Sequence, residues 1–250
     1  MERALEEADP EPTLQDLYFL GRAVAANILT VYRPYTGSPE LTRYLNHICQ
    51  AIVINNPAIG LFSGCWVLIL DSPEFNAFAS PGGHIFITKG FIEVMSSEDM
   101  LAAIIAHELA HIKLKHGMKV IEERLFDREL RSLSQHAIDS SREPQRAQRL
   151  MDFRATVEML TDTMLRSGYY YSQEIEADQE ALSLLAATGY DPGALTEALN
   201  VLREKQLSAG IVINATHPSP VERIRNIETW VRYYPVQDTR RYRAARFMNH

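Results

Sequence analysis

The segment His107-Glu108-Leu109-Ala110-His111 constrains this chain more than any other stretch of its sequence. On a helix, residues four apart lie on one face, so both imidazoles can reach a single metal ion. Glu108 then points about 100° round the helix from His107, towards a water molecule at that metal. Two neutral nitrogen ligands and one general base predict the core of a zinc hydrolase, most often a peptidase.

The residues around this motif predict the helix that would carry it. Ser96 with Asp99 forms a capping-box pattern, and apolar side chains recur at helical spacing over residues 100–112. Cationic residues at 113–116 suit the end of a helix, and Gly117 follows as a stop signal. The alternative is a solvated polar patch on a surface helix. The apolar setting favours a metal, because a buried His-Glu-His cluster needs compensation for lost hydration.

Composition narrows the class of protein. The chain has 250 residues, 46% hydrophobic and 23% charged, with a net charge of −7. No basic field indicates nucleic acid or an anionic membrane surface as a partner. No apolar run approaches the roughly 18–20 residues of a membrane span, and no signal peptide is apparent. We therefore expect either a cytosolic protein or the mature form of an exported one.

Periodicity and turn signals predict one mostly helical α+β domain over residues 13–250, preceded by a frayed segment at 1–12. A small sheet of about three strands is expected next to the motif helix. The two cysteines, Cys49 and Cys65, match no metal motif, and the sequence leaves open whether they are buried thiols or a disulfide. The predicted helices cover 13–31, 39–55, 118–140, 144–167, 172–187, 193–208 and 220–233, and the predicted strands cover 66–70, 76–79 and 84–88.

A catalytic zinc needs a third protein ligand, and the best candidate follows residue 172. Glu174 and Asp178 are four apart on one face of a predicted helix. Glu174 can bind the metal while Asp178 accepts the free N–H of a ligating histidine. Ala177 and Ala181 are small enough for this helix to approach the motif helix closely. Glu176 is the alternative ligand, and a solvated acidic face over residues 174–180 is the alternative to any metal site.

In order along the chain, several motifs resemble a known group of zinc metallopeptidases. This group includes HtpX, the CAAX-prenyl (Ste-type) endopeptidases and the mitochondrial Oma-type proteases. The resemblance covers about residues 14–230. It rests on Asn-Ala-Phe-Ala at 76–79 with Pro-Gly-Gly at 81–83, the His107 motif, Glu174 with Asp178, Gly-Tyr-Asp-Pro at 189–192, and Thr-His-Pro at 216–218 with Arg223.

The resemblance implies a gluzincin-type fold and proteolytic activity. It implies one zinc per chain, held by His107, His111 and Glu174, with Glu108 as the catalytic base. In some members of the group, a histidine in the position of His217 approaches the metal or helps to stabilise the oxyanion. The resemblance implies that an arginine in the position of Arg223 lies nearby.

One departure from the group lies just before the third-ligand glutamate. The group often has Ser-Arg there, whereas this chain has Tyr170-Tyr171, which puts the local support of that helix in doubt. The membrane-spanning helices of the integral-membrane members are absent. The chain therefore resembles the soluble bacterial branch associated with export, and the expected location is periplasmic or membrane-peripheral.

The working hypothesis is peptide hydrolysis in extended or misfolded proteins, with His217 or Arg223 stabilising the oxyanion. A substrate could pair as a strand with an exposed edge formed by Asn76, Ala77 and Phe78 or by Gly83 and His84. One rival is a zinc-binding, chaperone-like or latent protein in which His217 caps the metal. Another is a helical interaction domain without zinc.

The histidines at 84 and 116 are interpreted as surface or edge residues, and those at 47, 136 and 250 have no assigned role.

Overall fold

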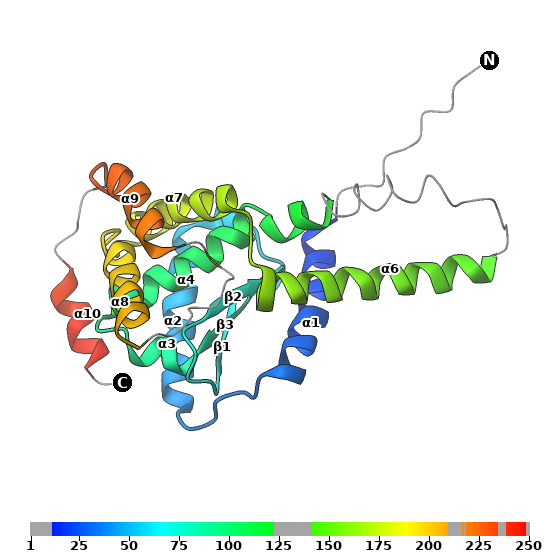
Figure 1. The fold of residues 1–250 in the computed structure, drawn as a ribbon, viewed down its shortest axis with the longest axis horizontal. Coiled ribbons are helices and arrows are strands. Elements are labelled where there is room, and N and C mark those ends of the chain that lie inside the picture. Colours follow the sequence, from blue (N-terminus) through cyan, green and yellow to red (C-terminus); the bar gives the residue numbers. More distant parts are fainter. Residues whose placement is uncertain (1–11, 123–141, 210–216, 218, 235–238, 249–250) are drawn as a thin grey trace, which may run out of the picture.

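The computed structural model describes residues 12–122, 142–209, 217, 219–234 and 239–248. Helices lie on both faces of a three-stranded sheet, and most of the later helices gather on the side away from α1 and α6 (Figure 1). The prediction of a mostly helical α+β domain with a small sheet is confirmed. The elements in order are α1 (Leu14–Val31), α2 (Pro39–Asn55), η1 (Pro57–Ile59), β1 (Trp66–Leu70), β2 (Ala77–Ser80), β3 (His84–Thr88), α3 (Lys89–Glu93), α4 (Glu98–Lys113), α6 (Arg142–Asp162), η2 (Thr163–Ser167), α7 (Tyr171–Thr188), α8 (Ala194–Ala209), α9 (Pro220–Val231) and α10 (Arg240–Phe247).

The first two helices begin and end where their sequences predict. In α1, the Thr13 backbone N–H donates to Asp16 at 2.9 Å and the Asp16 N–H donates to the Thr13 hydroxyl at 3.2 Å, which completes a capping box. In α2, Ser38 caps the N-terminus and Pro39 occupies the first turn, where a missing N–H costs nothing. Local capping chemistry therefore sets both starts.

The sheet has the order β1-β3-β2, with β1 parallel and β2 antiparallel to β3. The predicted turn between β2 and β3 is confirmed, since Gly82 and Gly83 adopt φ values of +77° and +104°. A side chain at Gly82 would overlap the Cα of Tyr18 in α1, so a residue with a Cβ does not fit there. The turn packs directly on α1 and so fixes that helix against the sheet.

Both faces of the sheet are buried, and alternate residues of each strand face different cores. On one face, Phe78 and Phe86 stack with their ring centroids 5.4 Å apart and pack with residues of α1 and α6. On the other face, Ala77 and Ala79 belong to the main core with residues of α4. The small alanines leave room for the motif helix close to β2.

The start of α4 differs by one residue from the prediction. Ser97, not Ser96, is the N-cap, and its hydroxyl accepts from the Met100 N–H at 3.2 Å. Asp99 is therefore not the partner in a capping box. It accepts hydrogen bonds from Arg243 Nε and from the Asp191 N–H, each at 2.9 Å. The Asp99 carboxylate, which the local pattern predicted as part of a helix cap, is instead bonded to residues far along the chain.

The helix α10, which was not among the predicted helices, is held to the first turn of α4 by two arginines. Arg243 pairs with Asp99, and Arg246 pairs with Glu98. Glu98 is 1% exposed and also accepts from the Tyr44 hydroxyl at 2.9 Å and the Tyr190 hydroxyl at 3.1 Å. These partners satisfy a carboxylate that is otherwise costly to bury.

The end of α4 also differs from the prediction. Leu114 is the C-cap, and Lys115 takes the left-handed conformation with φ of +54°. The chain becomes helical again at His116, so Gly117 is not the stop signal. The break after α4 turns His116 back towards the interior, with consequences for the site.

The remaining predicted helices are present with shifted ends where the structure describes them. The prediction for 144–167 corresponds to α6 followed by the π-helical turn η2, and α7, α8 and α9 match their predictions within two residues. Most of the predicted helix at 118–140 lies outside the described residues, as do His136, His250 and residues 1–11. The short helix α3 was not predicted. None of the described helices is long and apolar enough to cross a membrane.

Cys49 of α2 and Cys65, just before β1, form a disulfide with a Cα–Cα distance of 6.6 Å. The bond ties α2 to the sheet and closes a short loop of the chain. The sequence left open whether these cysteines are buried thiols or a disulfide, and the structure has the disulfide.

Removing this disulfide should destabilise the fold. Closing a loop of this length contributes about 3 kcal/mol by restricting the unfolded chain. The Cys49→Ala/Cys65→Ala protein should lose about that much free energy of unfolding, measured by urea denaturation. A reducing agent should destabilise the wild type and leave the double variant unchanged. Two titratable thiols in the unreduced, denatured wild type would contradict the bond.

Candidate active site

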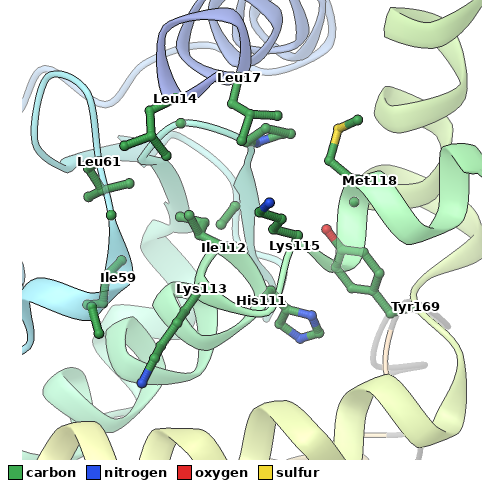
Figure 2. A pocket seen from close by; sticks show the side chains of 16 residues that line it. Leu14, Leu17, Ile59, Leu61, His111, Ile112, Lys113, Lys115, Met118 and Tyr169 are labelled. Carbon is green, nitrogen blue, oxygen red and sulfur yellow. The ribbon is translucent and has the colours of Figure 1, made fainter. Parts of the chain in front are cut away.

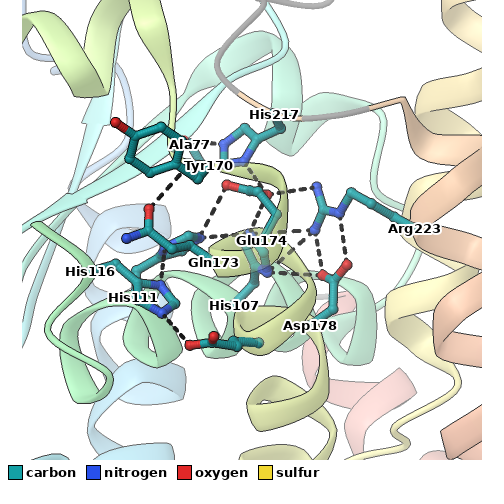
Figure 3. Close-up of polar contacts among 11 residues, drawn as sticks. Ala77, His107, His111, His116, Tyr170, Gln173, Glu174, Asp178, His217 and Arg223 are labelled. Atoms are coloured by element: carbon teal, nitrogen blue, oxygen red, sulfur yellow. Dashed lines mark hydrogen bonds and ion pairs between the residues drawn. The ribbon is translucent and has the colours of Figure 1, made fainter. Parts of the chain in front are cut away.

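The motif helix α4 and the helix α7 meet at small residues, as the sequence predicts. Ala177 and Ala181 are fully buried between them. This contact brings Glu174 of α7 opposite His107 and His111 of α4 (Figure 3). The two Nε2 atoms lie 3.2 Å apart, and the Glu174 carboxylate lies 3.5 Å from His107 Nε2 and 3.4 Å from His111 Nε2. All three residues are at most 4% exposed.

His217 is a fourth member of this cluster. Its Nδ1 lies 2.8 Å from Glu174 Oε2, and its Nε2 lies 3.5 Å from the carbonyl oxygen of Ala77 in β2. One ligand atom from each of His107, His111, Glu174 and His217 lies within 4.8 Å of the others. Thr216 and Pro218, which the resemblance included, lie outside the described residues.

Asp178 and Arg223 support the cluster from behind. Asp178 Oδ1 lies 3.1 Å from His107 Nδ1, so Asp178 can accept the N–H of that ring and direct Nε2 into the cluster. Arg223 of α9 donates from Nε at 2.9 Å and from Nη2 at 2.6 Å to the two Asp178 oxygens. Its third nitrogen, Nη1, lies 3.8 Å from Glu174. The Arg223 guanidinium therefore holds the Asp178 carboxylate in place, and Asp178 in turn orients the His107 ring.

The donor set fits a zinc ion. Two imidazoles and one carboxylate are a usual set of three ligands for catalytic zinc. Glu174 Oε1 is buried and, among the described residues, has no hydrogen-bond partner, although it faces His111. Glu108 Oε2 is likewise buried without such a partner in the described part of the chain. Buried carboxylate oxygens are rarely left without one, and a cation beside them supplies the compensation.

Comparison with known proteins identifies the family. The model of peptidase family M48 matches residues 39–231, which include every member of the cluster. The chain belongs to peptidase family M48. Peptidases of this family are metal-dependent, typically with zinc. The resemblance to the HtpX, Ste-type and Oma-type peptidases is thus confirmed.

Curated relatives match over much of this chain. The mitochondrial metalloendopeptidase OMA1 of Schizosaccharomyces pombe is 29% identical over 76% of the chain and 53% of the relative. The putative beta-barrel assembly-enhancing protease of Vibrio cholerae is 26% identical over 81% of the chain and 42% of the relative. The beta-barrel assembly-enhancing protease of Escherichia coli K12 is 25% identical over 85% and 44%. The chain thus spans about half the length of these M48 relatives.

His116 lies beside the M48 motif and is not the surface or edge residue that the sequence predicted. The prediction of a surface residue is wrong, because His116 is fully buried and its Nδ1 lies 2.9 Å from His111 Nδ1. Its Nε2 lies 3.2 Å from Glu176, so Glu176 faces away from the cluster rather than serving as the alternative ligand. In the sequence, the position of His116 five residues after His111 is the feature that could have indicated this contact. Figure 3 shows His116 beside His111.

The far side of His111 faces an aromatic ring and a cavity. Gly168, with φ of +69°, ends η2 and lets the chain turn, and the Tyr169 ring then stacks on His111 with centroids 4.2 Å apart. A cavity of about 170 Å³ opens beyond them, with an apolar lining that includes Leu14, Leu17 and Met118 (Figure 2).

The predicted substrate edge requires correction. β3 is the central strand, so Gly83 and His84 offer no free edge, and the prediction for them is wrong. His84 is partly buried and stacks on Tyr18, with ring centroids 5.4 Å apart. β2 is an edge strand, but its residues are at most 3% exposed, and Asn76 just before it is 2% exposed. Ala77 and Phe78 therefore lie on an edge that is covered in this structure.

The start of α7 has two polar contacts at the Tyr170-Tyr171 departure. The Tyr170 backbone N–H donates to Gln173 Oε1 at 3.1 Å, and this bond satisfies one of the free donors at the helix start. Asn226 of α9 donates to the Tyr171 hydroxyl at 3.1 Å. The helix that presents Glu174 is therefore capped from within and tied to α9.

Burial and neighbouring charges shift the pKa values of Glu108, Glu174 and His111 in different directions. Burial raises the pKa of Glu108 above its ordinary range, and His107 and His217 only partly offset this. Burial also opposes ionisation of Glu174, but His217 and His107 outweigh it and hold the Glu174 pKa well below its usual value. Burial lowers the His111 pKa well below its usual value, so that ring is neutral. A neutral imidazole and an ionised carboxylate are the forms that bind metal.

His116→Ala should weaken zinc binding, because His111 would lose the acceptor that orients its ring. Loss of such a support typically lowers metal affinity about 10- to 100-fold. Competition with a chromogenic chelator would measure the change. His116→Gln, which keeps an acceptor, should recover most of the affinity. His47→Ala, on the exposed face of α2, is the matched control. Equal affinity in His116→Ala and His47→Ala would contradict the role of His116.

Proposed function

We propose that this chain is a zinc metalloendopeptidase that hydrolyses peptide bonds in extended or misfolded proteins. The observation that carries the proposal is the buried Glu108 carboxylate oxygen, which has no hydrogen-bond partner among the described residues and lies beside a four-donor cluster, in a chain of peptidase family M48. A structural carboxylate in a protein core normally has its hydrogen bonds made. Glu98 and Asp178, with their arginine partners, are examples in this molecule.

In this proposal His107, His111 and Glu174 hold one zinc ion per chain. When bound, zinc supplies a Lewis acid that polarises a peptide carbonyl and makes water more acidic. Asp178 keeps the His107 ring in the tautomer that presents Nε2, and Arg223 keeps Asp178 ionised and in place. Arg223 then acts as a positioning residue, because two of its nitrogens are committed to Asp178.

Glu108 is the proposed general base and acid. It accepts a proton from the attacking water and delivers it to the amine that leaves. Its raised pKa suits both steps, because a group that first takes and then gives a proton works best with a pKa nearer to the working pH. The apolar surroundings of α4 keep other water from the carboxylate.

The proposed substrates are extended segments, because β2 is an edge strand whose outer backbone groups would pair with a peptide once His217 leaves the Ala77 carbonyl. The proposed compartment is oxidising, such as the periplasm, and the protein acts there in free or membrane-peripheral form. The Cys49–Cys65 disulfide supports this location, since such bonds persist mainly outside reducing compartments. The names of the bacterial relatives, which refer to beta-barrel assembly, are consistent with a role in protein quality control.

Replacing the proposed base should separate binding from catalysis. Glu108→Gln should keep about one zinc per chain by metal analysis and lose casein cleavage by a factor on the order of 10² to 10⁴. Glu180→Gln, a partner of Lys113 on the outer side of α7, is the matched control and should cleave normally. Undiminished cleavage by Glu108→Gln would refute the mechanism. Absence of zinc from the wild type would instead favour a metal-free interaction domain.

A latent state is the second candidate, and the position of His217 favours it. His217 contacts both Glu174 and the Ala77 carbonyl, which is the backbone group that an added strand would use. A fourth protein donor in the cluster also leaves no open position for water. In this state the protein binds zinc without cleaving protein, and it turns into a peptidase only when His217 moves away.

His217→Ala distinguishes a cap from a catalytic residue. If His217 caps the site, the variant should cleave casein faster than the wild type and keep its zinc. If His217 stabilises the oxyanion, kcat should fall by a factor on the order of 10² to 10³. The measurement is kcat/KM at fixed zinc loading, with His47→Ala as the matched control. A fall in kcat would rule out latency through this residue.

A further inference from the structure

Three arginines form an inward row on α10, at the end of the molecule where α9 also lies (Figure 1). Arg240, Arg243 and Arg246 follow one another at helical spacing, so they share one face of the helix. Each pairs with a carboxylate of the body within 3.2 Å. These ion pairs fix which way α10 faces, and they leave Arg241 and Tyr242 on the outside.

Two arginine–tyrosine pairs lie on the outside of this end. The Arg241 guanidinium lies 4.9 Å from the centroid of the Tyr242 ring, and Arg232 lies 5.1 Å from that of Tyr233. Tyr242 is 58% exposed and Tyr233 is 67% exposed. Trp230 is 46% exposed, and its ring centroid lies 6.5 Å from that of Tyr233. We call these five residues the arginine–tyrosine surface.

The stretch that carries this surface is basic, although the protein as a whole is acidic. Residues 230–248 contain five arginines and one acidic residue, whereas the whole chain has a net charge of −7. The composition of the whole chain averages this local charge away, so it predicted no anionic membrane surface as a partner. Charges more than about 8 Å apart are largely screened at physiological salt, so acids elsewhere on the protein oppose binding only weakly.

The residue types of the arginine–tyrosine surface match the interface of an anionic bilayer. Tryptophan and tyrosine rings are amphipathic and settle at the level of lipid headgroups. A guanidinium can donate to phosphate oxygens while its flat face stays stacked on a ring. Arg232 and Arg241 donate only to the neighbouring tyrosine hydroxyls among the described residues, and neither pairs with a carboxylate there. Both guanidinium groups therefore have donors left for phosphate.

A single-stranded nucleic acid also presents phosphate, but it fits this surface less well. Its bases would need aromatic ring faces on which to stack. Here a guanidinium already lies over one face of Tyr233 and of Tyr242. A bilayer makes no such demand, because a tyrosine can enter the headgroup layer with its ring stacked on an arginine.

We infer that the arginine–tyrosine surface docks this protein on an anionic lipid bilayer. Arg232 and Arg241 bind lipid phosphates, and Trp230 with the two tyrosines enters the headgroup layer. Four of the five residues lie beyond position 231, where the match to peptidase family M48 ends. The inference refines the membrane-peripheral location within the proposed function and does not depend on catalysis.

Sedimentation with lipid vesicles tests the inference. The wild type should bind vesicles of phosphatidylglycerol and phosphatidylcholine in equal parts much more tightly than vesicles of phosphatidylcholine alone. Each arginine near an anionic surface strengthens binding about fivefold, so Arg232→Gln/Arg241→Gln should weaken binding about 25-fold. Raising the salt concentration should release the wild type, because salt screens the attraction.

Arg154→Gln/Arg166→Gln is the matched control, because these exposed arginines belong to α6 and η2 (Figure 1). It loses the same charge and should bind vesicles as the wild type does. Glu108→Gln should also bind normally, so vesicle binding and peptide cleavage are tested separately. Equal melting temperatures would show that both arginine double variants are folded.

Trp230 provides a second measurement, since the chain has only two tryptophans. In Trp66→Phe, Trp230 is the single reporter. Its fluorescence should shift to shorter wavelength with the anionic vesicles and become less sensitive to quenching by acrylamide. Trp230→Phe, which keeps Trp66 at the start of β1, should show neither change.

Three results would overturn the inference directly. They are equal binding to both kinds of vesicle, equal binding by the two arginine double variants, and an unchanged Trp230 spectrum. Release from the vesicles by inorganic phosphate, at an ionic strength where chloride has no effect, would instead assign the arginines to a soluble anion. Binding to single-stranded RNA but not to vesicles would assign the surface to nucleic acid. Both of these results would also overturn the inference, and neither would affect the proposed peptidase activity.

Discussion

The close approach of α4 and α7 is the contact on which the rest of the site depends. Fully buried Ala177 and Ala181 let the two helices approach closely enough for Glu174 to reach both histidines of α4. A larger side chain at either alanine would separate the helices and leave charged groups buried without partners. Burying such groups without partners is costly in a protein core, so one substitution at this contact would disturb both the packing and the electrostatics of the site.

The buried carboxylates of α4 and α7 differ in whether an arginine pairs with them. Those at the start of α4 are neutralised by Arg243 and Arg246 of α10, and Asp178 is neutralised by Arg223. Glu108 has no arginine partner among the described residues and keeps an unsatisfied oxygen. The fold thus pairs these three buried acids with arginines and leaves the proposed base without such a partner in the described part of the chain, which is the pattern expected of a group kept for chemistry.

The sequence predicted those features that depend on local periodicity. The helical spacing of four residues links His107 with His111 and Glu174 with Asp178, and the structure brings all four together. Turn and capping residues placed the sheet and most helices. Features that depend on distant contacts were missed. Asp99 pairs with Arg243 rather than with a cap, and the left-handed Lys115 redirects His116 into the core.

The covering of β2 was unpredictable for the same reason. Strand patterns identify Ala77 and Phe78 as part of a strand, but an edge is exposed or buried according to what packs over it. Here His217, more than a hundred residues later in the chain, contacts the Ala77 carbonyl. Neither residue type nor spacing encodes that contact.

The double contact of His217 has a thermodynamic consequence. One imidazole contacts both Glu174 and the backbone of β2, so in the proposed latent state a peptide would compete with it at both places in a single event. The proposed closed and open forms would then be two states of one equilibrium, and the apparent affinity for substrate would be the intrinsic affinity multiplied by the fraction of molecules that is open. Weak peptides would rarely capture the open form. A long segment that pairs well with β2 would itself shift the population towards it.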